Sequence, residues 1–266
     1  MISSMFNTFF YEPLYNGLIF LMTNVIPWAD VGVAIIIFTI IIKLILLPIS
    51  FKAIRTQVQM KEVEPEIKKI KEKNKNNNQA QAVELMNLYK GRGIKPFSGF
   101  FLMFLQLPII LALYFIFLKG GFPVVKTEIL YSFILKPETV NIMFLGLVDI
   151  TQKNLVIAVI AGLTQFFHTM VAMPKDKKSD KDAKTTKTFK DEIMKSMSTQ
   201  MRYVFPFIVF FISYKLSTAV AIYWATSNIV HIFQEIYIRK RIKTQESNKV
   251  YPIAQSKTGG TGAIKQ

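Results

Sequence analysis

Hydrophobic positions along this chain gather in long runs, and the residues between the runs are mostly polar or charged. Runs of about 20 apolar residues predict helices that cross a bilayer, because such a helix spans roughly 30 Å. The run 203–233 is interrupted by charge only at Lys215, is too long for one span, and predicts two helices joined by a tight turn. Five membrane-spanning helices are therefore predicted, at 31–50, 97–118, 155–173, 197–214 and 216–238.

Lys and Arg are distributed unevenly over the connections. Residues 1–30 hold none and 119–154 hold four, whereas 51–96 hold eleven, 174–202 hold nine and 238–266 hold seven. Because basic connections stay on the cytoplasmic side, this bias predicts an N-terminus outside and a C-terminus in the cytoplasm. The predicted connections are then an external loop at 119–154, a cytoplasmic loop at 174–196 and a basic cytoplasmic tail at 239–266.

The first segment, 1–30, is apolar between Leu14 and Trp28 but is interrupted by polar residues such as Asn16 and Asn24. It has no basic start of the kind that opens a signal peptide. An amphipathic N-terminal helix that lies in the interface on the outer face is therefore predicted. A cleaved signal peptide is the alternative.

Residues 51–96 look like a soluble insertion. Two stripes of apolar residues at helical spacing occur in it, one on each side of the break at 74–78, and this pattern predicts a charged helical hairpin on the cytoplasmic side. The stripes are Val63, Ile67 and Ile70, and then Val83, Met86 and Tyr89. A solvated linker is the alternative.

The composition supports an all-α, polytopic membrane protein. The chain has 266 residues, of which 51% are hydrophobic, and no Cys, so disulfides, thiolate metal sites and Cys nucleophiles are excluded. Its net charge of +16 lies in blocks between apolar runs, which favours membrane topology over DNA binding. With only two His and no Cys in the chain, we expect no enzyme activity, catalytic residue, metal or cofactor.

Lys43 is the only charged residue in the run 31–50. A single ammonium at the centre of a bilayer helix costs about 2.5 to 3.5 kcal/mol, so it usually faces a wet cavity or a partner. Because Pro48 is only five residues away, the side chain could instead reach the interface along its own stem. Both interpretations are open on position alone.

Other polar residues in the predicted spans are candidates for the same cavity. Gln106 precedes Pro108, where a break could expose backbone carbonyls; Gln165 and His168 share one helical face; and Tyr223 and Trp224 form an aromatic pair in the fifth span. Each also has a plainer interpretation, which is a hydrogen bond or packing between helices.

Three stretches of the chain resemble the YidC/Oxa-type membrane protein insertases. They are IIIKLILLPISFKAIRTQVQMKEVEPEIKKIKEK from Ile40, ELMNLYKGRGIKPFSGFFLMFLQLPIILALY from Glu84, and QMRYVFPFIVFFISYKLSTAVAIYWATSNIVHIFQE from Gln200. The resemblance covers about residues 10–240 and is to the short forms, which lack a large periplasmic domain. It implies a five-helix bundle in the bacterial cell membrane, with the cytoplasmic hairpin and the interfacial N-terminal helix.

The resemblance also implies a function. The protein would receive nascent membrane proteins from the cytoplasm in a hydrophilic groove, release their helices sideways into lipid, and act as a chaperone in protein transport. The groove residues would be Lys43, Gln106, Gln165, His168, Tyr223 and Trp224. Members typically carry Arg where Lys43 stands, so charge is kept and the rigid guanidinium fork is lost.

Further partners follow from the same resemblance and from charge. The ribosome and a Sec-type translocon are expected partners, and the basic tail could touch anionic lipids or ribosomal RNA. The tail could equally serve only to fix topology. A small transporter or channel subunit with a polar path through the membrane is the alternative function. Against it, the five spans have no obvious internal repeat.

Overall fold

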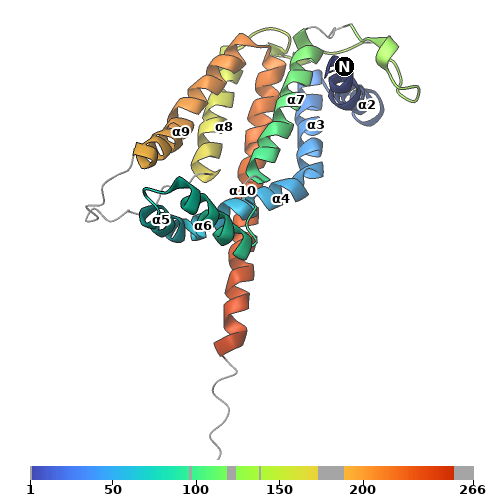
Figure 1. Cartoon of the computed structure of the whole chain (residues 1–266). Helices are drawn as coiled ribbons and strands as arrows, with labels where there is room; N and C mark the ends of the chain where they lie inside the picture. Colours follow the sequence, from blue (N-terminus) through green and yellow to red (C-terminus); the bar gives the residue numbers. More distant parts are fainter. Residues whose placement is uncertain (1, 96–97, 119–123, 138, 173–188, 255–266) are drawn as a thin grey trace, which may run out of the picture. The chain divides into compact units, whose positions relative to one another are not determined.

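The computed structural model describes residues 2–95, 98–118, 124–137, 139–172 and 189–254. The chain divides into two compact units, which are treated separately below. Unit 1 comprises Met1–Pro48 and Phe100–Phe233, and unit 2 comprises Ile49–Gly99 and Gln234–Gln266. Both units are built mainly from helices, in agreement with the predicted all-α class (Figure 1).

The elements follow in chain order, with η marking π- and 3₁₀-helical segments. They are α1 (Ile2–Phe6), η1 (Asn7–Tyr11), α2 (Glu12–Phe20), η2 (Leu21–Val25), α3 (Val31–Ile45), α4 (Leu47–Glu62), α5 (Glu64–Lys73), α6 (Asn78–Gly91), α7 (Ser98–Leu118), η3 (Thr127–Ile129), β1 (Met143–Phe144), β2 (Val148–Asp149), α8 (Leu155–Ala172), α9 (Phe189–Lys215) and α10 (Thr218–Ala254).

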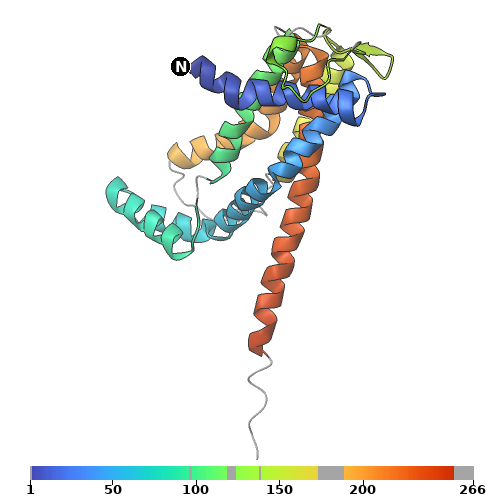
Figure 2. The same cartoon turned by 90° about the vertical axis from the view of Figure 1, so that its right-hand side faces the viewer.

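In unit 1 the helical segment at the N-terminus lies across the end of the bundle formed by α3, α7, α8, α9 and the first part of α10 (Figures 1 and 2). Its inner face is fully buried in the main hydrophobic core, which it shares with α3, α7 and α10. Tyr15 and Leu18 of α2 meet Ile35 of α3, Leu113 of α7 and Tyr223 of α10 in this core. Burying such side chains stabilises a fold in water by about 1.5 to 3 kcal/mol each. Helix α2, predicted to lie in the membrane interface, thus also contributes side chains to the core.

Helix α3 ends earlier than the predicted span 31–50. It stops at Ile45, Leu46 caps it, and α4 begins at Leu47. Pro48 accounts for the break, because it has no N–H to donate and its ring clashes with the carbonyl four residues earlier. By contrast, the turn expected near Lys215 is present, since α9 ends at that residue and α10 begins at Thr218.

Small residues allow α8 to pack closely against two neighbours. Ala161 of α8 packs with Ala221 and Ala225 of α10 in a small buried cluster. On the side of α9, a Cβ on Gly162 would come within 3.0 Å of Phe210. In lipid the hydrophobic effect does not favour helix association, so helices associate through van der Waals contacts that small residues make possible.

The predicted external loop, 119–154, contains ordered structure in its described part. Residues 143–149 form a two-stranded antiparallel hairpin, with Met143 opposite Asp149. Hydrogen bonds to backbone groups tie this connection to helices of unit 1. Asn16 of α2 donates to the Ile129 carbonyl (2.9 Å) and accepts from the Tyr131 N–H (2.8 Å). The Thr218 and Ala219 N–H groups at the start of α10 donate to the Gln152 and Ile150 carbonyls.

Asp30 makes a further attachment and caps α3. One carboxylate oxygen accepts from the Val33 N–H (2.9 Å), which is the usual N-cap bond, and the other accepts from the Leu145 N–H (3.0 Å) in the hairpin turn. Asn141 adds a carbonyl for the Val31 N–H. The first turn of α3 is thus satisfied partly by the hairpin.

Length and composition make one described helix, α8, a candidate membrane span. The pair α3 and α4, taken together across their break, is a second candidate, and α7 contains a shorter apolar stretch at Phe104–Phe117. The count of five spans stays a prediction.

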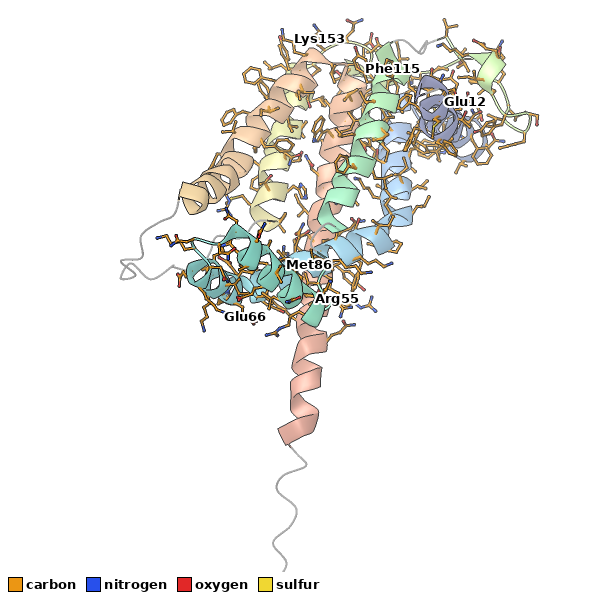
Figure 3. The ribbon with its side chains drawn as sticks, viewed as in Figure 1. Glu12, Arg55, Glu66, Met86, Phe115 and Lys153 are labelled. Atoms are coloured by element: carbon orange, nitrogen blue, oxygen red, sulfur yellow. The ribbon has the colours of Figure 1, made fainter. Side chains whose placement is uncertain are left out.

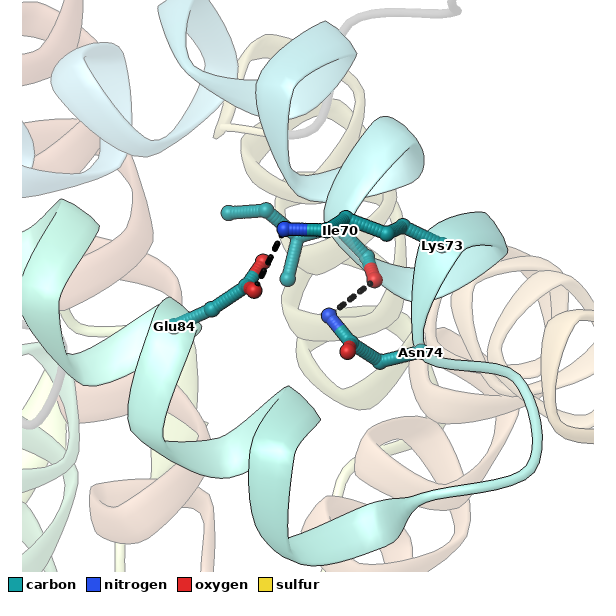
Figure 4. Close-up of polar contacts among 4 residues, drawn as sticks. All are labelled: Ile70, Lys73, Asn74 and Glu84. Atoms are coloured by element: carbon teal, nitrogen blue, oxygen red, sulfur yellow. Dashed lines mark hydrogen bonds and ion pairs between the residues drawn. The ribbon is translucent and has the colours of Figure 1, made fainter.

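Unit 2 contains α5 and α6, on which Figure 3 labels Glu66 and Met86. Ion pairs connect this helical pair. Lys73 donates to Glu84 at 2.7 Å, and Arg92 donates to Glu66 at 2.6 Å. The hydrogen bond from Lys73 lowers the pKa of the Glu84 carboxyl, while Asn74 donates to the Ile70 carbonyl and closes α5 (Figure 4).

One of the two apolar stripes predicted in this segment faces inward only in part. Val63 is buried, as its stripe suggested, whereas in the second stripe Val83 and Met86 are exposed and Tyr89 is half-buried. The half-buried side chains of α6 include Leu85 and Leu88 instead. The apolar stripe visible in the sequence therefore does not coincide with all the half-buried side chains of α6.

The C-terminal helix is longer than the predicted fifth span. It continues to Ala254, and the Arg239 side chain bonds Glu235 one turn earlier at 2.7 Å. Within unit 2 the same Arg239 reaches Gln57 of α4 at 3.5 Å. Residues 174–188 of the predicted cytoplasmic loop and 255–266 of the predicted tail lie outside the described residues.

Gly32 should be intolerant of a side chain. A Cβ at this position would clash with the ring of Phe144 and lie within 3 Å of three atoms of that side chain. We expect Gly32→Val to lower the free energy of unfolding by about 1 to 3 kcal/mol, since overpacking forces the hairpin away from α3. Thermal unfolding in detergent measures this change.

Gly91→Ala is the matched control, because nothing lies within 4 Å of a Cβ at that position. It should leave the unfolding temperature nearly unchanged. Equal unfolding temperatures for Gly32→Val and the unmodified chain would contradict the contact.

Candidate functional site

Lys43 lies in the last turn of α3 and is almost completely buried, with 2% of its surface exposed. Its ammonium donates to the side-chain oxygen of Gln106 on α7 at 2.8 Å. It also lies 2.9 Å from Nε2 of His231 on α10. Because an ammonium can only donate, Nε2 has to be the unprotonated nitrogen of the ring while Lys43 is charged. Of the two interpretations of Lys43, burial with polar partners is the one that the structure supports.

Gln106 links Lys43 to a second helix. Its amide nitrogen donates to the hydroxyl of Tyr223, so the amide accepts from Lys43 on one side and donates to α10 on the other. Tyr223 is itself buried. Pro108 lies inside α7 and has no N–H, which frees the carbonyl of Phe104 from its usual helical bond. Buried polar groups need such partners, because an unsatisfied one costs about 1 to 3 kcal/mol.

The two histidines of the chain meet at this network. The rings of His168 on α8 and His231 on α10 are stacked, with centroids 5.2 Å apart and an angle of 22° between their planes. Nδ1 of His168 is buried and has no hydrogen-bond partner among the described residues. The cluster of Lys43, Gln106, Tyr223, His168 and His231, called the lysine cluster below, therefore draws on α3, α7, α8 and α10.

A second polar group lies between α8 and α10. The indole N–H of Trp224 donates to the side-chain oxygen of Gln165 at 3.0 Å. The amide of Gln165 donates in turn to the Thr169 hydroxyl at 3.3 Å. One turn further along α10, Asn228 donates to Thr164 at 3.3 Å. Polar pairs of this kind hold helices together in lipid, at about 0.6 kcal/mol each.

The six residues predicted as candidates thus fall into two groups. Lys43, Gln106 and Tyr223 are bonded in series, and His168 joins them through its stacking on His231. Gln165 and Trp224 bond each other in the second group.

His231 and Thr169 are the residues that sequence reasoning missed. His231 is seven positions after Trp224, a spacing that returns to the same face of a helix, and this periodicity could have identified it. Thr169 is four positions after Gln165, so it lies on the same helical face as that candidate.

When the Lys43 amine is protonated, the lysine cluster carries a positive charge beside two neutral acceptors. Gln106 and the unprotonated His231 accept hydrogen bonds from Lys43 without cancelling its charge. In surroundings of low dielectric constant such a charge attracts an anion far more strongly than it would in water. Among the described residues no three His, Cys, Asp or Glu gather as a metal site would require.

Comparison with known proteins identifies relatives over most of the chain. A family model described as 60Kd inner membrane protein matches residues 21–246. A membrane protein insertase YidC of Clostridium tetani is 32% identical, over 90% of this chain and 94% of its own. Proteins of the same name from Fusobacterium nucleatum and Wolinella succinogenes are 27% and 25% identical; they align over 88% and 91% of this chain and over 98% and 39% of their own.

The bond between Gln106 and Tyr223 should contribute measurably to stability. Tyr223→Phe removes the acceptor of a buried amide N–H, so we expect the free energy of unfolding to fall by about 1 to 3 kcal/mol. Thermal unfolding of the purified protein in detergent measures the change. Tyr214→Phe, at an exposed ring of α9, is the control and should have little effect.

A double-mutant cycle tests whether the two side chains act together. In a chain that already carries Gln106→Leu, the further change Tyr223→Phe should cost much less than it does alone. Additive losses would show that the two side chains do not interact.

Proposed function

The chain belongs to the 60Kd inner membrane protein family, and we propose that, like its relatives named YidC, it is a membrane protein insertase. The observation that carries the proposal is the buried ammonium of Lys43, which polar side chains from two other helices hold inside an apolar bundle. A charge in such a place is costly, and within a membrane it typically marks the path of a substrate.

The substrates that we propose are nascent membrane proteins. Such a chain must bring a polar segment into the bilayer, where each unsatisfied backbone group costs several kcal/mol. A groove lined by the lysine cluster and by Gln165 and Trp224 would offer that segment polar partners and, through Lys43, an attraction for its acidic residues. The apolar helix of the substrate would then move sideways into lipid, which is favourable by about 0.8 kcal/mol for each methylene transferred.

We further propose that the groove opens toward the cytoplasm, with the N-terminus outside and five spans in the bacterial inner membrane. The basic residues in 51–96, 174–202 and 238–266 support this orientation. The helical pair α5 and α6 would then be a cytoplasmic recruitment element. The ribosome, a Sec-type translocon and anionic lipids are the partners that a basic cytoplasmic face would favour.

A small transporter or channel subunit would use the same polar residues as a path for a solute. Reconstituted liposomes separate the two functions, because an insertase integrates a single-span protein with a short acidic tail without conducting ions or small solutes. In this scheme the chain has no catalytic role and binds no cofactor.

Charge at Lys43 should decide the insertion of acidic substrates. Lys43→Arg should retain insertion of a single-span substrate with an acidic tail, whereas Lys43→Glu should reduce it roughly tenfold or more, since like charges brought together cost several kcal/mol. Protease protection of the tail in liposomes measures insertion.

Two controls distinguish a charge effect from a folding defect. Lys215→Glu reverses a charge at an exposed turn and should insert normally. A substrate with a neutral tail should still be inserted by Lys43→Glu. Insertion of the acidic tail at the unmodified rate by Lys43→Glu would contradict a requirement for positive charge.

Topology can be tested with single cysteines, because the chain has none of its own. Cysteines that replace the exposed residues Ser4 and Thr139 should react with a membrane-impermeant thiol reagent added outside intact cells. A cysteine at the exposed Asn76 should react only after the membrane is permeabilised. Labelling of Asn76 from outside, with none at Thr139, would reverse the proposed orientation.

A further inference from the structure

The turn of the β1–β2 hairpin presents two large apolar side chains to the surroundings. Leu145 and Leu147 are 64% and 81% exposed, and Gly146 between them has a positive φ of 72°. Leu145 itself has a φ of 52°, a left-handed conformation that is unfavourable for any residue except Gly and, to a lesser extent, Asn or Asp. A strained turn that displays two leucines would be a liability in water, because exposed apolar side chains promote aggregation.

This turn is held firmly in place. The Leu145 N–H donates to Asp30, and Phe144 packs against Gly32 so closely that no Cβ would fit. The hairpin is thus fixed to the first turn of α3, and the leucines face away from the core with little freedom to fold back. Figure 1 shows the hairpin beside α2, at the end of unit 1 where α3 begins.

The same end of unit 1 carries further exposed apolar residues. Trp28, two positions before Asp30, is 78% exposed. Phe133, which is also exposed, packs its ring edge-on against Phe20 of α2, with centroids 6.2 Å apart. Trp is enriched where a membrane meets water, because its ring is apolar and its N–H needs a polar partner. The hairpin turn therefore belongs to a set of exposed apolar and aromatic groups at one end of a membrane protein.

We propose that the β1–β2 turn is a lipid anchor, with Leu145 and Leu147 embedded among the acyl chains of the membrane leaflet nearest the start of α3. Lipid is the occupant that these observations favour. The exposed residues lie on the rim of a bundle whose family is named for the inner membrane, together with the exposed Trp28 and Phe133. Leu145, Gly146 and Leu147 carry no charge that would oppose their entry into acyl chains. The anchor goes beyond the insertase function and does not depend on which end of the bundle faces the cytoplasm.

Spin labelling tests the anchor directly in the full-length protein reconstituted in liposomes. A nitroxide is attached to a cysteine at Leu147 and, in a second variant, at Phe133. Collisions with oxygen, which dissolves in lipid, are compared with collisions with a nickel chelate, which stays in water. The reference for lipid is a label at Leu163, an exposed position on the candidate span α8, and the reference for water is a label at Asn76 on unit 2.

The anchor predicts that the label at Leu147 has a ratio of oxygen to nickel collisions close to that at Leu163 and severalfold above that at Asn76. A ratio at Leu147 equal to that at Asn76 would overturn the proposal. A label at Leu147 shielded from both reagents would also overturn it, because a protein partner or a second copy of this chain would then cover the turn. Insertion activity is measured on the same variants, so a failed anchor and a failed insertase remain distinguishable.

Discussion

The structure of unit 1 depends on giving hydrogen-bond acceptors to an ammonium that apolar helices surround. Lys43 alone cannot remain charged in such a place, so α7 has to supply Gln106 and α10 has to supply His231 within bonding distance. The requirement extends beyond these two residues. Gln106 needs Tyr223 as the acceptor for its own N–H, and the ring of His231 stacks on the ring of His168. One charge therefore fixes the relative positions of four helices more specifically than apolar packing does, because hydrogen bonds have direction and dispersion does not.

The sequence was sufficient to identify six residues of the two polar groups, although not His231 or Thr169, and it was insufficient to pair them. A polar residue such as Gln106 is easily recognised in an apolar run. Because exposing its amide to lipid is costly, its side chain is expected to face the interior of the bundle. Which side chain it meets depends on how helices far apart in sequence cross, and Lys43 and His231 are separated by 188 positions. His231 was overlooked because it lies at the end of its run, where a polar residue is as easily explained by the interface.

The fold shows the same division between local and non-local information. The break after Ile45 follows from Pro48, which is visible in the sequence. The apolar run nevertheless continues past this proline, and its length alone predicts an uninterrupted span over 31–50. The β1–β2 hairpin has strands of two residues, too short for an alternating pattern, so it could not be predicted. On α6, Leu88 is half-buried and Met86 is exposed, a difference that helical periodicity alone did not predict.

The double use of the Asp30 carboxylate has a consequence for the order in which the chain assembles during synthesis. Its bond to Val33 is local and can form as soon as α3 emerges, whereas its bond to Leu145 must wait for a residue 115 positions later. Asn16 waits as long for Tyr131. Contacts so distant in sequence form late, because the entropy of closing the intervening loop must be overcome first. The N-terminal end of unit 1 is therefore completed only after α3 and α7 have been made, although its own residues leave the ribosome before those helices.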